Sequence, residues 1–262
     1  MLPRMSPRAA LSLAAVPRLA AVAWLAAAFG AAGCATAPEA THAGARLWED
    51  WRVLGPGVFA ERLGDASRAA GRPDSGALFP LGPDDRRTLV AALEDPVGTD
   101  ATRAAVLLAH SAAHGDAAAR AALAARLERR AIAPSRSEAG ADVVAAAALA
   151  PHAVRDKQLA ARLVALAAGE RPHPELDVRV ECASAALGAG RREVVPFLLA
   201  VLRAETPAQG ALDWPRTTSL AWAKGRAGDA LAAHAGLSLT VRPDASWADQ
   251  LADVARIEAA LR

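Results

Sequence analysis

The chain has 262 residues, of which 53% are apolar but only 4% aromatic, and tyrosine is absent. Alanine, the strongest helix former, supplies much of the apolar content, while β-branched and aromatic strand formers are sparse. This composition predicts an all-α fold and argues against a fold built on β-sheets.

The formal net charge of +2 comes from the N-terminal segment. Arg4, Arg8 and Arg18 are the only charged residues before Cys34, so the chain from Cys34 onward carries 27 basic and 28 acidic residues. Such a balance lacks the strong positive charge typical of proteins that bind nucleic acids, and we expect no nucleic-acid partner. Cys34 and Cys182 alone do not indicate a disulfide framework.

Residues 1–33 have the pattern of a bacterial export signal. The arginines precede an uncharged apolar run over 19–32, which is too short to span a bilayer but fits the apolar region of a signal peptide. The run ends in Ala31-Ala32-Gly33-Cys34, which resembles the lipidation motif of bacterial lipoproteins, with Ala31 where Leu is usual. The resemblance implies cleavage before Cys34 and lipid attachment to its thiol. An ordinary secretory signal is the alternative.

Residues 34–46 are small or polar and contain Pro and Gly, so they predict a flexible tether ahead of a body over 47–262. Ala35, rather than Asp, follows Cys34, and by the same resemblance this gives no cue for retention in the inner membrane. We therefore expect an exported, membrane-anchored lipoprotein at the outer membrane or periplasmic face rather than the inner membrane.

The body begins with two short helical patterns. Over 47–55, two leucines and two tryptophans share one helical face, and over 57–70 Val58, Phe59 and Leu63 are spaced as an inward face. Asp84 is then predicted to cap a helix that ends near Glu94.

Three helix pairs follow, over 100–113 with 116–130, 140–150 with 154–168, and 177–188 with 192–204. Each pair carries apolar stripes, such as Val194, Leu198 and Leu202 at i, i+4 and i+8. A lone helical hairpin cannot bury such stripes, so each pair requires a similar neighbour. The step from Leu149 to Leu187 is 38 residues, which is typical of an α-solenoid.

A helix over 218–235 and a final helix complete the chain. Asp244 and Ser246 are predicted to cap the final helix. Four apolar residues of that helix lie on one predicted face: Leu251, Val254, Ile257 and Leu261.

The stretch from Asp177 to Leu202 resembles a HEAT repeat of the short bacterial type, related to phycobilisome-lyase-like proteins. The matching residues are Asp177, Val178, Arg179, Ala186, Leu187, Gly188, Val195, Pro196, Leu198 and Leu202. The resemblance implies an α-solenoid of about four HEAT-like hairpins plus a C-terminal capping helix. Solenoid motifs indicate architecture and not activity.

His110 and His114 share a helix face at i, i+4 spacing and are weak candidates for metal ligands. The Glu of a zinc-protease helix is missing, and no cluster in the sequence supplies a third ligand. These histidines underlie one alternative function, an enzyme or enzyme accessory that is lyase-like or metal-dependent. The main prediction is that there is no catalytic residue, cofactor or bound metal. Cys182 lies on an apolar face and is predicted to be a packing residue.

The family resemblance places the second helices of the pairs on a concave surface. They carry basic residues that form a possible interaction face for an acidic peptide, an envelope polymer or a lipid headgroup: Arg120, Arg126, Lys157, Arg162 and Arg203. A solvated surface is the alternative. The sequence thus predicts a lipid-anchored scaffold that binds unknown protein partners, and it indicates neither their identity nor the oligomeric state.

Overall fold

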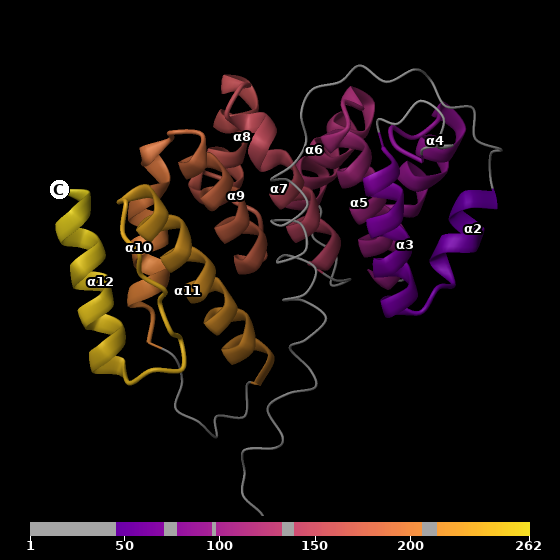
Figure 1. The fold of residues 1–262 in the computed structure, drawn as a ribbon. Helices are drawn as coiled ribbons and strands as arrows, with labels where there is room; N and C mark the ends of the chain where they lie inside the picture. The colour runs from indigo at the N-terminus through magenta and orange to yellow at the C-terminus, as the bar shows by residue number, and fades with distance from the viewer. Residues whose placement is uncertain (1–45, 71–77, 96–97, 133–138, 206–213) are drawn as a thin grey trace, which may run out of the picture.

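The computed structural model describes residues 46–70, 78–95, 98–132, 139–205 and 214–262 (Figure 1). These residues form eleven α-helices, α2 to α12, and one short 3-10 helix, η2, and no β-strand occurs among them. The predicted all-α fold is therefore confirmed. The predicted signal peptide, nearly all of the predicted tether and Cys34 lie outside the described residues.

The three predicted helix pairs form within three residues of the predicted bounds. They are α5 (Gly98–Ala113) with α6 (Ala117–Ile132), α7 (Gly140–Ala153) with α8 (Lys157–Ala168), and α9 (Leu176–Gly188) with η2 (Arg192–Val194) and α10 (Val195–Arg203). Before them lie α2 (Arg46–Arg52), α3 (Pro56–Ala69) and α4 (Pro83–Ala92), and after them α11 (Trp214–His234) and α12 (Trp247–Leu261).

Local sequence signals explain several helix ends. Gly115, Gly190 and Gly236 have φ of 95°, 83° and 68°, and they follow α5, α9 and α11. This left-handed conformation favours glycine and ends a helix sharply. At the start of α8, the Asp156 carboxylate accepts hydrogen bonds from the backbone N–H groups of Gln158 and Leu159, both at 3.0 Å. The Ser246 hydroxyl caps α12 in the same way, as predicted, whereas Asp244 lies in the preceding turn and is not the cap.

The helices pack in two rows (Figure 1). In the first row, α5, α7, α9 and α11 lie side by side, and each packs against the next. In the second row, α6 packs against α5 and α7, α8 against α7 and α9, and α10 against α9 and α11. At the ends, α4 packs on α5, while α12 packs on α10 and α11. Each inner helix of the first row is thus held by the helices before and after it.

Small side chains allow the first row to pack closely. Every residue of α9 from Val180 to Leu187 is buried, including three alanines and Cys182. Burial raises the pKa of the Cys182 thiol, so the thiol stays protonated at neutral pH. The same pattern holds in α7, where the buried residues are again mostly alanine and valine. The stripes identified in the sequence are therefore the interior of the protein.

Three predicted details differ from the structure. Val58 and Leu251 were expected to face inward, but they are 53% and 41% exposed. Their neighbours Phe59 and Val254 are buried as expected. Helical spacing determines the direction in which each side chain points, but the adjacent helices determine how wide the buried face is. Asp84 lies in the first turn of α4 and does not cap it, since Pro83 occupies the first position and Gly82 the cap position.

Candidate functional site

His110 and His114 lie at the C-terminal end of α5, where they pack against aromatic and polar neighbours. The Ser67 hydroxyl of α3 lies 2.8 Å from His110 Nδ1. The Phe79 ring stacks on both imidazoles, with ring centroids 5.6 Å and 5.9 Å away. Burial, together with the charge of His114, lowers the pKa of His110 to about 4. His110 is therefore neutral at pH 7 and packs as a core residue.

The acidic residue nearest to these histidines in the sequence, Asp116, is engaged elsewhere. Its Oδ1 accepts hydrogen bonds from the backbone of Ala118 and Ala119, while Oδ2 accepts from Ser111 at 2.8 Å and Arg86 at 3.0 Å. Although burial opposes ionisation, these bonds lower the pKa of Asp116. Within the described ranges, no group of three or more His, Cys, Asp and Glu side chains is arranged to hold a metal ion.

Arg126 does not lie on a basic surface, so its place in the predicted interaction face is wrong. Its side chain is 4% exposed, and its Nε lies 2.5 Å from Oδ1 of Asp142 in α7. Asp142 is itself fully buried, and a buried carboxylate requires a cationic partner close by. Arg126 therefore belongs to the interior of the protein.

The other four predicted basic residues lie on the second helices of the pairs, and two of them form ion pairs. Arg203 of α10 forms an ion pair with Glu258 of α12, whereas Arg162 of α8 lies 3.5 Å from Glu128 of α6. Arg120 of α6 and Lys157 of α8 lie near the turn between α7 and α8. The charges of Arg120 and Arg162 both act on Asp156 in that turn. The hydrogen bonds from Leu159 and Gln158, with these two arginines, lower the pKa of Asp156.

A buried polar cluster around Asp142 joins three segments of the chain. Besides Arg126, Arg130 of α6 places its Nε 3.3 Å from Asp142 Oδ2, and His173 places its Nε2 3.8 Å away. His173 Nδ1 accepts the backbone N–H of Glu175 at 3.2 Å, so the neutral ring carries its proton on Nε2, toward Asp142. Burial lowers the pKa of His173 despite the opposing effect of Asp142. We did not predict this cluster, although its signal is present: Asp142 is the only acidic residue in an alanine-rich helix.

Further buried charges join the C-terminal helices. Arg226 of α11 donates two hydrogen bonds, at 2.7 Å and 2.8 Å, to the buried carboxylate of Glu181 in α9. Lys224 is fully buried; its Nζ donates to Gln250 Oε1 at 2.9 Å and lies 4.6 Å from the centroid of the Trp247 ring. Burial lowers the pKa of Lys224. These groups hold α9, α11 and α12 together.

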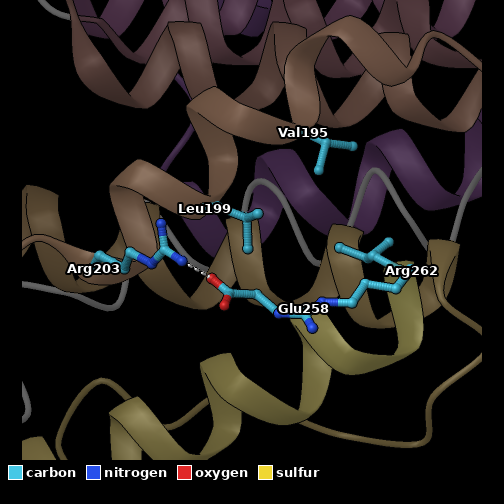
Figure 2. A pocket seen from close by; sticks show the side chains of 6 residues that line it. Val195, Leu199, Arg203, Glu258 and Arg262 are labelled. Carbon is cyan, nitrogen blue, oxygen red and sulfur yellow. Dashed lines mark hydrogen bonds and ion pairs between the residues drawn. The ribbon is translucent and has the colours of Figure 1, made fainter.

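An open hollow lies between α10 and α12 (Figure 2). Val195 and Leu199 of α10 and Leu261 of α12 form its apolar part, and the Arg203–Glu258 ion pair crosses one end. Its charged members are surface residues, so the hollow offers contact area and not an enclosed place for a reacting group.

In the part of the protein that the structure describes, no helix is both long and apolar enough to cross a membrane. Comparisons with protein-family models, curated proteins and solved structures give no match.

Proposed function

We propose that the protein is a lipid-anchored α-solenoid of HEAT-like hairpins that presents an extended helical surface to protein partners in the bacterial envelope. Its anchor is the lipidated Cys34, and residues 34–46 are the tether. In this proposal the protein is a scaffold and does not catalyse a reaction.

The observation that carries the proposal is the order of helix packing. Each of α5, α7 and α9 packs on the next helix of its row, and each of α6, α8 and α10 bridges two members of that row. Contacts between successive hairpins are the defining property of solenoid proteins, which use their long surfaces for binding. This packing agrees with the HEAT resemblance over Asp177–Leu202.

A second observation supports a scaffold. Three buried groups capable of acid–base chemistry are engaged between helices: Asp142 with Arg126, Glu181 with Arg226, and Lys224 with Gln250. Buried pairs of this kind fix which helices meet and in what register. We infer that these charges serve the architecture.

Labelled palmitate and crosslinking test the proposal in cells. The native chain should incorporate the label and fractionate with membranes, and Cys34→Ala should lose both properties because the thiol is the attachment point. Cys182→Ala is the matched control, since Cys182 is buried and should leave labelling unchanged. Crosslinking of the native chain in the envelope should then capture a protein partner. Equal labelling of the native and Cys34→Ala chains would refute the anchor.

A further inference from the structure

Basic side chains gather where the first and second helix of each pair meet. Because α5, α7 and α9 run in the same direction, with Gly140 at the start of α7 beside Thr102 near the start of α5, the three turns lie along one edge. We call residues 114–120, 154–157 and 189–193 the turn edge. Its basic residues are Arg120, Arg155, Lys157, Arg191 and Arg192.

These residues are neighbours in space as well as in topology. Arg120 of the first turn and Arg155 of the second both act on His152, whose pKa is lowered by burial and by their two charges. η2, which begins with the exposed Arg192, packs against α8, which begins with the exposed Lys157. The positive charges therefore form a continuous line over three helix pairs.

The acidic groups of the turn edge are few and engaged. Asp116 is buried and paired with Arg86, and Asp156 caps α8. Glu193 forms an ion pair with Arg191 at 2.7 Å. The turn edge thus carries excess positive charge, although the body as a whole is nearly neutral.

The opposite edge, where one pair connects to the next, has the opposite charge. We call the described residues between the pairs, 93–95, 169–175 and 204–205, the acidic edge, and they carry five acidic side chains: Glu94, Asp95, Glu170, Glu175 and Glu205. Arg171 is the only Lys or Arg among these residues. Two edges of opposite sign would orient the body beside a charged surface.

The entry of the chain places the turn edge within reach of the anchor. Arg103, near the start of α5, donates to the backbone carbonyls of Arg52 and Leu54, so α2 ends beside the acidic edge. The chain from Cys34 therefore enters α2 from its other end, which points away from the acidic edge (Figure 1). Twelve residues from Cys34 to Arg46 reach at most about 40 Å.

We propose that the turn edge rests on an anionic phospholipid surface when the protein is anchored through Cys34. The inference rests on the proposed lipid anchor for its orientation. Basic residues near an anionic bilayer each strengthen binding roughly fivefold. Val154, 62% exposed and next to Arg155, adds an apolar contact at the centre of the edge. The acidic edge and the helical surface are then left for protein partners.

Vesicle flotation of the mature chain, residues 34–262 with Cys34→Ser, tests the edge without the anchor and without the basic, apolar signal peptide. We expect binding to vesicles of equal parts phosphatidylglycerol and phosphatidylcholine, weakening as salt rises, and little binding to phosphatidylcholine alone. Arg155→Glu with Lys157→Glu should weaken the anionic binding at least about tenfold. The matched control is Arg129→Glu with Arg171→Glu, the same change in net charge made at the acidic edge and next to it, which should change binding less than about twofold.

Three results would overturn the inference: equal binding to neutral vesicles, equal loss in both double variants, or no binding to anionic vesicles. Binding of polyglutamate in place of the vesicles would assign the turn edge to an acidic polypeptide. Because every chain in the flotation assay lacks Cys34, its outcome is independent of palmitate labelling. Failure of the anchor and failure of the turn edge are thus distinguishable.

Discussion

The middle of the helix stack and its two ends are held by different contacts. In the middle, α7 and α9 pack through alanines and valines and are joined to their neighbours by the buried pairs of Asp142 and Glu181. At the N-terminal end, Trp51 and Phe59 pack edge to face with centroids 5.5 Å apart, and Phe79 stacks on His110. At the C-terminal end, Trp247 covers Lys224.

This difference follows from the number of neighbours that each helix has. A helix with neighbours on both sides can use small side chains, because close approach buries its faces. A terminal helix has a neighbour on one side only, and large side chains cover more surface there. Buried charged groups occur in both regions, such as Asp142 in the middle and Lys224 at the C-terminal end, whereas the edge-to-face and stacked ring contacts lie at the N-terminal end.

The largest expected effect on stability comes from removing the Asp142 carboxylate in the middle of the stack. Asp142→Ala removes the acceptor of the buried Arg126 Nε, and we predict a loss of about 3–5 kcal/mol in the free energy of unfolding, measured with urea. Glu94→Gln removes the exposed ion pair with Arg129 and should cost less than about 1 kcal/mol. Similar losses in the two variants would show that the buried cluster contributes no more to stability than an exposed ion pair does. Arg126→Met with Asp142→Leu should recover much of the stability.

A series of unfolding measurements at different pH tests whether His110, at the N-terminal end of the stack, is buried in its neutral form. His110 has a pKa near 4 in the folded protein and about 6.5 in the unfolded chain, so below pH 6.5 the unfolded chain binds more protons. Stability should therefore fall as pH drops from 6.5 to 4, by about 3 kcal/mol from this group. His110→Gln should remove that part of the pH dependence. The same slope in both chains would contradict a neutral, buried His110.

A smaller effect is expected at the C-terminal end, where Gly228 of α11 lies against Val241. A Cβ on Gly228 would lie 2.4 Å from Val241 Cγ2, so Gly228→Ala should cost about 1–3 kcal/mol. Gly225→Ala is the control, since its Cβ would meet only Pro243 at 3.7 Å, and it should stabilise the helix by up to about 1 kcal/mol. Adding Val241→Ala to Gly228→Ala should show favourable coupling in a double-mutant cycle of urea unfolding. Additive losses would mean that this contact is not tight.

The helices in the middle of the stack could be predicted well from the sequence, whereas the pairing of the buried charges there could not. Apolar stripes at helical spacing gave α5 to α10 within three residues, because the period and the glycine stops are local signals. The burial of Arg126 depends on Asp142, 16 residues away, and no local pattern gives that pairing. Lys224 was missed for the same reason, since its partners Gln250 and Trp247 belong to the last helix.

The candidate sites were less predictable than the helices. Helical spacing correctly placed His110 on α5, whereas His114 lies in the turn directly after that helix, and the Ser67 and Phe79 contacts come from other segments. The basic face was predicted from the second helices alone, whereas the structure collects basic residues at the turns, including Arg155 and Arg192. Which turns lie side by side is a property of the packed rows and not of any one helix.

The most direct test of the packing between pairs is the behaviour of one pair alone. We predict that an isolated α7–α8 peptide, residues 139–169, has little helix by circular dichroism and no cooperative thermal transition as a monomer, because its apolar faces lose α5, α6 and α9. A monomeric peptide that is fully helical and melts cooperatively would contradict the proposal that each pair depends on its neighbours.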